Sequence, residues 1–359
     1  MAEILGIGLT HYPGPVVPTK AWPDMLKTGV RFGMVSQDLY DNKQRWPEAM
    51  RAEWGDDEGQ SAAKAHLARL LAGFARLRAE LDAFKPDLLV IWGDDQYENY
   101  KLDCVPPFCV GIHGTIVSKP YAGGRVPFNT EDNVWGYPPD TEMVNQGHFE
   151  AGHGLTTHLM QAGYDVSWAR TLRDPAGLAH SFANTVIGLD YAQAGQAFPY
   201  PIIPVHVNCY GNHIVRGAAK LENKRTGPEI APPSPSPARC FGLGAETARY
   251  FRDSPWRVAL IGSSSWSHGN LTDKNHNFWP DLASDAKRLD DLKTGAYRTW
   301  GEIPLAEIED AGQHEMLNWV ALAGAMAALD RDCEVVDYVE SHLFNSSKCF
   351  ALFRESDAA

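Results

Sequence analysis

The chain has 359 residues, 44% of them hydrophobic, so it can bury a large core in one or two units. Its formal net charge of −13 provides no basic face for a phosphate backbone, so we expect no nucleic-acid partner. The N-terminal segment lacks the basic and apolar regions of a signal peptide, and no run approaches the length of a membrane-spanning helix. These features predict a cytoplasmic protein with no membrane partner.

The first predicted strand leads into a histidine. The apolar residues of ILGIGL predict a short buried strand near the start of the chain, and Thr10 and His11 follow it. Pro13, Gly14 and Pro15 then turn the chain away from the sheet. We therefore expect His11 at the mouth of the sheet.

Helices and strands are predicted to alternate through the rest of the chain. Apolar residues at helical spacing predict a helix over 61–84, and the apolar run over 88–92 predicts a buried strand. Further strands are predicted in FCVGIHGTIV, DVSWARTL, YPIIPVHVNCY and WRVALIGSSSWSHG, and further helices over 144–162, over 240–252 and in AGQHEMLNWVALAGAMAAL.

Such alternation predicts an α/β fold. We expect a single large catalytic domain over 1–359, with a twisted mixed central sheet, helices on both faces and an active-site cleft at the strand ends. Residues 211–238 are rich in Pro, Ser, Gly and charge, and they are predicted to form a long surface excursion within this domain.

Three predicted strands end in side chains of the types that can bind metal ions. They end at His11, at Asp94-Asp95-Gln96 and at His268, and if the strands are neighbours these tips share one cavity. Glu315, in the first turn of the last predicted helix, can complete a set suited to iron, manganese or zinc. Each residue also has a structural interpretation: hydrogen bonding for a histidine, a helix-dipole contact for Glu315, and a turn or helix cap for the aspartates.

An ordered series of motifs resembles one enzyme family. The motifs are GIGLTHYPG, DLLVIWGDDQ, VPPFCVG, GHGLTTHLMQAGYDV, GLAHSFANTVIGL, IIPVHVNCY, RCFGLG, RVALIGSSSWSHG and HEMLNWVALAGAM. Their order resembles that of the class III extradiol ring-cleavage dioxygenases, from residue 4 to about residue 330. The likeness is to the catalytic β-type subunit of protocatechuate 4,5-dioxygenase and to its gallate and 3-O-methylgallate relatives.

The resemblance implies roles for individual residues. It makes His11 and Glu315 iron ligands and His268 the catalytic acid/base, and it makes His180 an active-site histidine that contacts a substrate hydroxyl or bound oxygen. The family's second histidine ligand is missing, and Gln96 stands in its place. The ligand from this region stays open between Gln96, Asp95 and a more distant histidine, such as His113, His148 or His206. Aromatic and polar residues near the mouth are candidate substrate walls, namely Tyr12, Tyr97, His206, Tyr210 and Trp266.

The predicted function is that of a non-haem Fe(II)-dependent extradiol dioxygenase, which uses O2 to open the ring of a catechol-type or gallate-type aromatic. The oxygen-rich ligand set also suits Mn(II). Two alternatives stay open. One is a metal-dependent hydrolase or lyase in which Asp95, Glu315 and His11 hold a redox-inert ion. The other is a non-catalytic homologue that acts as a partner subunit. The resemblance also implies a homodimer or higher oligomer, with or without a small helical subunit.

Overall fold

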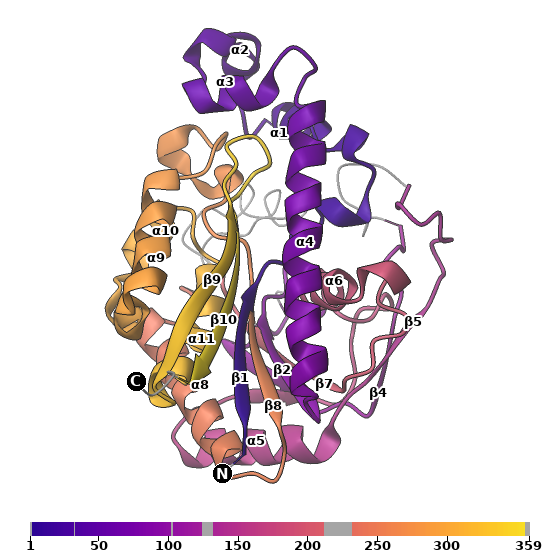
Figure 1. Ribbon diagram of the computed structural model, residues 1–359, viewed down its shortest axis with the longest axis vertical. Helices are drawn as coiled ribbons and strands as arrows, with labels where there is room; N and C mark the ends of the chain where they lie inside the picture. The colour runs from indigo at the N-terminus through magenta and orange to yellow at the C-terminus, as the bar shows by residue number, and fades with distance from the viewer. Residues whose placement is uncertain (1, 32, 102, 124–131, 212–231, 356–359) are drawn as a thin grey trace.

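The computed structural model describes residues 2–31, 33–101, 103–123, 132–211 and 232–355 (Figure 1). Most of the excursion predicted over 211–238 lies outside these residues. The strands are β1 (Ile4–Leu9), β2 (Leu88–Gly93), β3 (Phe108–Gly111), β4 (Thr115–Ser118), β5 (Met143–Gln146), β6 (Ser167–Ala169), β7 (Ile202–Val207), β8 (Val258–Ser263), β9 (Arg331–Val339) and β10 (Lys348–Glu355). The helices are α1 (Asp24–Arg31), α2 (Gln37–Asp41), α3 (Glu48–Trp54), α4 (Gln60–Phe84), α5 (Phe149–Gln161), α6 (His180–Leu189), α8 (Pro237–Arg252), α9 (Leu282–Thr294), α10 (Leu305–Asp310) and α11 (Met316–Ala328).

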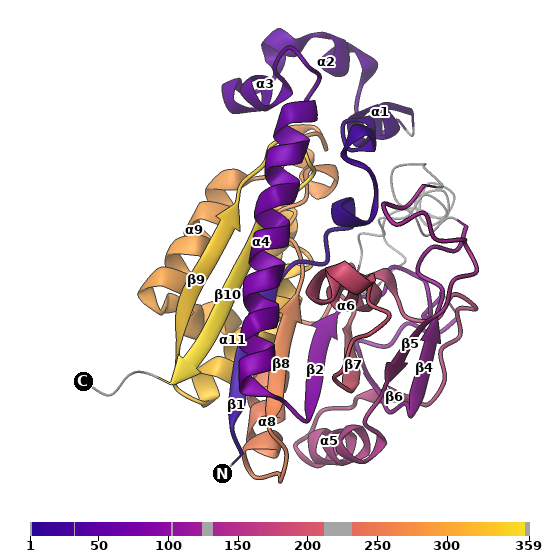
Figure 2. The ribbon, with the colours of Figure 1, turned by 45° about the vertical axis from the view of Figure 1, so that its right-hand side comes forward.

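A mixed sheet of eight strands runs through the molecule in the order β6-β3-β7-β2-β8-β1-β10-β9. Its four central strands, β7, β2, β8 and β1, are parallel to one another. The flanking strands β3 and β10 run antiparallel to their inner neighbours. In Figure 2 the arrowheads of β2 and β8 point towards the level of α6. A separate hairpin pairs β4 with β5.

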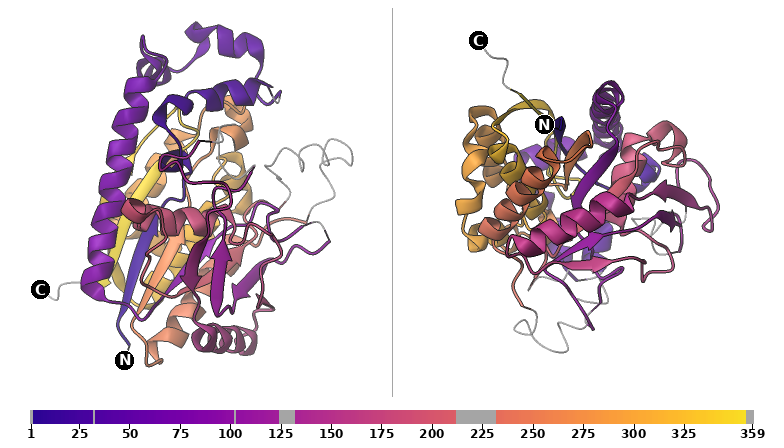
Figure 3. Two further views of the ribbon diagram at one scale, coloured as in Figure 1. Left: turned by 90° about the vertical axis from the view of Figure 1, so that its right-hand side faces the viewer. Right: turned by 90° about the horizontal axis from the view of Figure 1, so that it is seen from below.

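Helices cover both faces of the sheet. In β2, Leu89 and Ile91 belong to an apolar core that includes residues of α4 and α6, whereas Leu88, Val90 and Trp92 belong to a second core built with α8 and α11. This alternation follows from the two-residue repeat of side chains along a strand. Figure 3 (left) shows α4 running along one side of the strands. The predicted α/β fold, with a mixed sheet and helices on both faces, is confirmed.

Several predicted elements differ from the observed ones. The strand predicted in FCVGIHGTIV is two strands, β3 and β4, because the chain leaves the main sheet after Gly111. The helix predicted over 144–162 begins only at Phe149: residues 143–146 form β5, whose side chains alternate between buried and exposed, and His148 caps the helix by accepting a hydrogen bond from Ala151 N. Among the described residues, no helix is both long enough and apolar enough to span a bilayer.

Candidate metal centre

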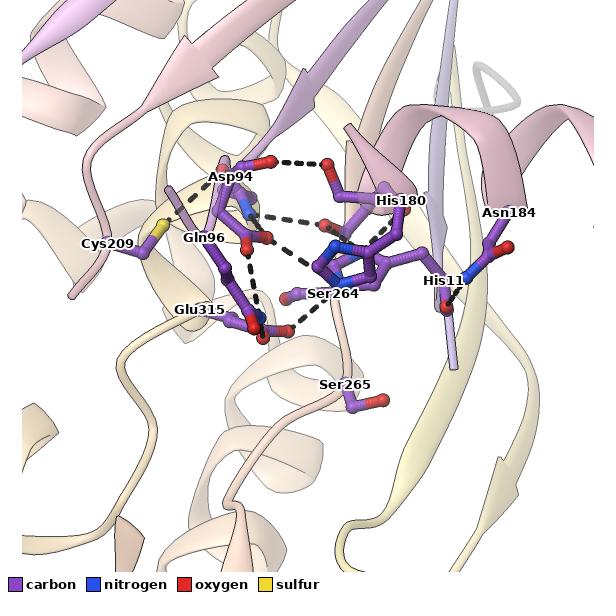
Figure 4. A network of polar contacts seen from close by, with 12 residues as sticks. His11, Asp94, Gln96, His180, Asn184, Cys209, Ser264, Ser265 and Glu315 are labelled. Atoms are coloured by element: carbon purple, nitrogen blue, oxygen red, sulfur yellow. Dashed lines mark hydrogen bonds and ion pairs between the residues drawn. The ribbon is translucent and has the colours of Figure 1, made fainter. Parts of the chain in front are cut away.

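The three strands that carry the predicted polar tips are neighbours. Strand β8 lies between β1 and β2 and is parallel to both, so all three end at the same edge of the sheet. His11 follows β1 by two residues, Asp94 follows β2 directly, and His268 lies five residues beyond β8. The predicted convergence of these tips is found in the structure: Figure 4 shows His11 and Asp94 together with Glu315, and His268 Nε2 lies 3.5 Å from Glu315 Oε1.

Two histidines of this cluster are held by backbone carbonyl oxygens. Nδ1 of His11 lies 3.1 Å from the carbonyl oxygen of Ser263, and Nδ1 of His268 lies 2.7 Å from that of Trp266. Because a carbonyl oxygen can only accept, Nδ1 carries the proton in both neutral rings. The second nitrogen, Nε2, is thus the one that each ring presents to other groups.

Two buried carboxylates face these imidazoles. Nε2 of His11 lies 3.6 Å from Asp94 Oδ1 and 3.2 Å from Glu315 Oε2, and Nε2 of His268 lies 3.5 Å from Glu315 Oε1. The aspartate is 0% exposed and the glutamate 2% exposed. Among the described residues, no Lys or Arg pairs with either carboxylate, and their basic neighbours there are histidines.

His180, the first residue of α6, joins the same cluster. Its ring meets that of His11 edge to face, with 5.4 Å between the centroids. Its Nδ1 lies 2.9 Å from Oε2 of Glu98, a carboxylate that is 1% exposed. One possible ligand atom from each of His11, Asp94 and His180 lies within 4.8 Å of the others.

The close packing of these groups shifts their pKa values. Burial lowers the pKa of His11, but the carboxylates of Glu315 and Asp94 outweigh it and raise that pKa to about 9. Burial, followed by the charge of Glu315, raises the pKa of Asp94 to about 6. Burial opposes ionisation of Glu315, yet His268 and His11 hold its pKa below the usual range. Burial lowers the pKa of His268 despite the nearby Glu315. Such shifts accumulate at functional sites.

Gln96 and Tyr210 connect the two carboxylates. Nε2 of Gln96 lies 3.3 Å from Asp94 Oδ2, 3.3 Å from Glu315 Oε1 and 2.7 Å from the hydroxyl of Tyr210. That hydroxyl donates to Glu315 Oε1. The amide of Gln96 therefore turns its nitrogen to the cluster, an orientation for hydrogen bonding and not for coordination of a cation.

Asp95 does not face the cluster. Its Oδ1 accepts hydrogen bonds from the backbone N–H groups of Glu98, at 2.8 Å, and Tyr100, at 3.3 Å, while its Oδ2 accepts from Asn99 at 2.8 Å. A carboxylate that already holds three amides of the following loop is a turn-stabilising group. Of the two aspartates, the structure brings Asp94 to the cluster, so the predicted metal role of Asp95 does not fit its placement.

The predicted substrate walls are not all brought to the cluster. Trp266 packs its buried ring against Trp319 and Tyr338 in the core. Tyr12 turns its ring away, with Trp22 at 5.4 Å and the ammonium of Lys348 at 3.8 Å from its centroid.

Two further positions lie in or beside the loop after β2. His206 lies 4.7 Å, centroid to centroid, from Tyr100, and burial lowers its pKa to about 3. Tyr97 is half-buried and has a left-handed backbone, with φ of 61°. Among the predicted wall residues, Tyr210 reaches the cluster, through hydrogen bonds to Glu315 and Gln96.

His113, His148 and His206 do not supply the missing ligand, whereas His180 offers a possible ligand atom beside His11 and Asp94. His148 caps α5 and contacts Trp256. His113 lies in the connection between β3 and β4, where burial lowers its pKa. Neither of them, nor His206, belongs to the group that could hold an ion.

Some residues of the cluster escaped prediction. Nδ2 of Asn318 lies 3.2 Å from the carbonyl oxygen of Ser263 and 3.5 Å from Asp94 Oδ1. Its position three residues after Glu315 was an available signal, because residues three apart share a helix face. Glu98 gave no comparable signal, since it lies in a polar loop whose path depends on Asp95.

The donor set fits a divalent cation. Imidazole nitrogen and carboxylate oxygen are the ligands used for Fe(II), Mn(II) and Zn(II). Glu315 Oε2 is buried and has no hydrogen-bond partner among the described residues, although it lies 3.2 Å from His11 Nε2. A cation between them would satisfy both atoms and balance the buried negative charge. The fold and the cluster thus define an α/β protein with a candidate metal centre at the ends of its parallel strands.

Comparisons with known proteins point to a class of enzyme. The chain is 24% identical over 221 residues to a 2,3-dihydroxyphenylpropionate/2,3-dihydroxicinnamic acid 1,2-dioxygenase of Pseudomonas putida, covering 62% of this chain and 54% of that protein. It is 25% identical over 194 residues to the Comamonas testosteroni enzyme, covering 54% of this chain and 47% of the relative. In these matches the chain spans about half the length of the curated relatives. A Paraburkholderia phymatum relative is 23% identical over 305 residues, which are 73% of this chain and 82% of that protein.

The chain is therefore related to the extradiol ring-cleaving dioxygenases, as the ordered motifs indicated. No protein-family model matches it. Among solved structures, an uncharacterised protein from Escherichia coli K12 aligns over 98% of this chain and 99% of its own, with 12% identity and a TM-score of 0.44.

Proposed function

We propose that this chain is an Fe(II)-dependent extradiol dioxygenase of the class III type, which opens the ring of a catechol-type or gallate-type aromatic with O2. The observation that carries the proposal is the buried cluster at the ends of β1, β2 and β8, where His11 Nε2 lies within 3.6 Å of two carboxylates. The kinship with enzymes named as dioxygenases of 2,3-dihydroxyphenyl substrates supports it.

We assign the metal to His11, Asp94 and Glu315. In this assignment Asp94 takes the role of the family's second histidine, so the set has one imidazole and two carboxylates. Carboxylate oxygens are harder ligands than imidazole nitrogens, so this set also suits Mn(II). These residues would hold the ion, and a bound Fe(II) would supply the Lewis-acid and redox chemistry that ring opening with O2 requires.

His268 is the proton-handling residue on one side of the cluster. Its Nδ1–H is held by the carbonyl oxygen of Trp266, so Nε2 has a free lone pair when the ring is neutral. Burial lowers the pKa of His268, which keeps the neutral ring populated near pH 7. The ring can therefore accept a proton from a substrate hydroxyl and return it to the product.

His180 binds and orients the substrate from another side. Glu98 accepts its Nδ1–H, which directs the other nitrogen away from the Glu98 carboxylate. A ring held in this way can hydrogen-bond to a substrate hydroxyl. The cluster is almost fully buried: His11 is 3% exposed and Asp94 0% exposed. Exclusion of water strengthens the contacts of charged groups and protects reactive species.

Anaerobic reconstitution with Fe(II), followed by oxygen-electrode traces, tests the proposal. The substrates are protocatechuate, gallate, 3-O-methylgallate and 2,3-dihydroxyphenylpropionate. We expect about one Fe per chain and substrate-dependent oxygen uptake for the wild type. His11→Ala, Asp94→Ala and Glu315→Ala should each lose most of the iron. His268→Ala should keep the iron and lose about 10²–10⁴-fold in kcat, the usual contribution of general acid–base catalysis.

The same experiment separates the alternatives. Iron without oxygen uptake on any catechol, together with hydrolysis or bond cleavage in the absence of O2, favours the metal-dependent hydrolase or lyase. No bound metal in any variant leaves the non-catalytic partner subunit. Iron retained by Asp94→Ala but lost from Gln96→Ala would return the ligand role to Gln96.

A further inference from the structure

The segment that carries His268 is fixed by four consecutive backbone N–H groups. The N–H groups of Trp266, His268 and Gly269 donate to carbonyl oxygens of other loops, at 3.2, 2.9 and 2.6 Å. The remaining N–H, that of Ser267, donates instead to a side chain, Asp285 Oδ1, at 2.9 Å. Asp285 is therefore the one side chain among the acceptors that hold this segment.

The same oxygen holds the segment that leads to Glu315. Nε2 of Gln313 donates to Asp285 Oδ1 at 2.7 Å, and Gln313 stands two residues before Glu315. A single carboxylate thus bridges the segments that present the acid/base histidine and the proposed carboxylate ligand. It comes from a third element, α9, which lies beside β9 in Figure 1.

Asp285 is a buried carboxyl group in surroundings that do not favour its charge. The residue is 0% exposed, and no Lys, Arg or His pairs with it among the described residues. Burial of such a group costs free energy that a neutral side chain would not cost. Residues that break a packing rule in this way gather where function constrains geometry.

A second set of contacts clamps the same point. The hydroxyl of Ser267 accepts a hydrogen bond from the backbone N–H of Asp281 at 2.7 Å and donates to the carbonyl oxygen of Ala311 at 2.5 Å. The start of α9 and the segment before Glu315 therefore both meet at Ser267. Asp285 completes this junction by tying the backbone of Ser267 to Gln313.

We propose that Asp285 is a positioning residue that fixes His268 against Glu315, so that the proton-handling nitrogen stays 3.5 Å from the carboxylate. The inference rests on the proposed dioxygenase function. Asp285 does not touch the reacting atoms: it acts through Ser267 and Gln313. A displacement of about 1 Å at a catalytic group can lower a rate about 100-fold, so a bridge of this kind has kinetic consequences.

The kinetic test compares Asp285→Ala with Asp285→Asn in the Fe(II)-loaded enzyme. We expect Asp285→Ala to keep its iron and its KM within about threefold and to lower kcat about 10–100-fold. Asp285→Asn should recover most of kcat, because its side-chain oxygen can accept the same two N–H donors. Asp281→Asn is the matched control: this carboxylate caps α9 and pairs with Lys274, yet its side chain does not contact Ser267 or Gln313.

A second readout needs no activity. In metal-free protein with ¹⁵N-labelled histidine, wild-type His268 should show a single Nδ1–H tautomer, assigned by its loss in His268→Gln. Asp285→Ala should show averaged tautomers, whereas Asp285→Asn and Asp281→Asn should resemble the wild type. If Asp285→Ala does not fold, Gln313→Ala cuts one arm of the bridge and should change kcat and the tautomer signal in the same direction.

An alanine variant with wild-type kcat and an unchanged tautomer signal would overturn the positioning role. Equal losses in Asp285→Ala and Asp285→Asn would also overturn it, because then the two hydrogen bonds are not what matters. If the wild type consumes no oxygen with any catechol, the proposed function fails, and the tautomer comparison still decides whether Asp285 fixes His268.

Discussion

Glu98 receives two contacts from one histidine: the backbone N–H of His180 at 3.1 Å and its Nδ1 at 2.9 Å, both to Oε2. A carboxylate that holds the far nitrogen of a site histidine sets both its tautomer and its ring orientation. Removing such a partner typically costs 10–100-fold in activity or affinity. Glu98 therefore serves the site although it is absent from the proposed ligand set.

We predict that Glu98→Ala lowers kcat about 10–100-fold and leaves the iron content of the folded enzyme unchanged. Glu98→Gln should fall between Glu98→Ala and the wild type, because its amide can accept only at one of its two terminal atoms. Oxygen uptake and an iron assay on the same samples measure both quantities. Glu48, an exposed residue of α3, provides a neutral control as Glu48→Ala. Loss of iron in step with activity would instead make His180 a metal ligand.

For single residues, the sequence predicted the position of the site better than the role of each residue in it. His11, His268 and Glu315 come together as their strand-end and helix-start positions suggested. The sequence could not predict which of Asp94 and Asp95 faces the cluster. Adjacent residues after a strand point in opposite directions, and the path of the loop decides which one turns inward. That path is set by hydrogen bonds to amides later in the loop.

The loop after β2 is an element of its own, built on Asp95. Three backbone N–H groups of residues 98–100 donate to this carboxylate, and the loop in turn holds the segment before α6: Asn99 Nδ2 donates to the carbonyl oxygen of Gly177 at 3.1 Å. The neighbouring residues Asp94 and Asp95 thus have two different roles: Asp94 belongs to the candidate metal centre, and Asp95 stabilises the loop.

We predict that Asp95→Ala lowers the free energy of unfolding by about 1–3 kcal/mol, since buried N–H donors lose their acceptor. Asp95→Asn should recover part of this loss. Urea unfolding of the metal-free protein measures the change, and the folded fraction of Asp95→Ala should still bind iron. Asp94→Ala should show the opposite pattern, with iron lost and stability retained or increased, because a buried charge is removed. Iron loss in Asp95→Ala at unchanged stability would contradict this division.

Elements with a clear apolar pattern were predictable, and elements defined by their partners were not. The helix over 61–84 and the strand over 88–92 match α4 and β2 closely, because each carries its own periodic signal. Strand β5 was hidden within a predicted helix, and its pairing with β4 gives it its structure. Glu315 lies at the N-cap of α11 and not in its first turn, a difference of one residue.

At the scale of the whole molecule, the site exists because β8 inserts between β1 and β2. Strands β2 and β8 lie more than 150 positions apart in the sequence. In the sheet, Val258 of β8 pairs with Leu88 of β2 on one side and with Ile4 of β1 on the other. Strand order is a long-range property that local patterns do not encode, although parallel strands joined by crossover helices restrict the choices. The shared edge then collects charges from distant segments into one buried cluster, with consequences for stability.

Asp285 makes a contribution to the free energy of unfolding that depends on pH and can be measured. Burial raises its pKa from the ordinary 3.8 to about 7, so between these values the folded chain keeps a proton that the unfolded chain has released. Unfolding then releases a proton, and the free energy of unfolding contributed by this group falls as pH rises. The contribution is complete below about pH 4 and is lost above about pH 7, and a shift of about three units corresponds to roughly 4 kcal/mol at most.

Asp285→Asn cannot titrate, so the difference in unfolding free energy between it and the wild type isolates this group. We predict that metal-free wild type loses stability relative to Asp285→Asn between pH 5 and pH 8, by up to roughly 3 kcal/mol, while the titrations of other groups cancel in the difference. Urea unfolding of both proteins at several pH values measures it. A difference that stays constant across this range would mean that Asp285 is already ionised at pH 5, held by Ser267 and Gln313, and that the bridge to His268 is charged throughout the range.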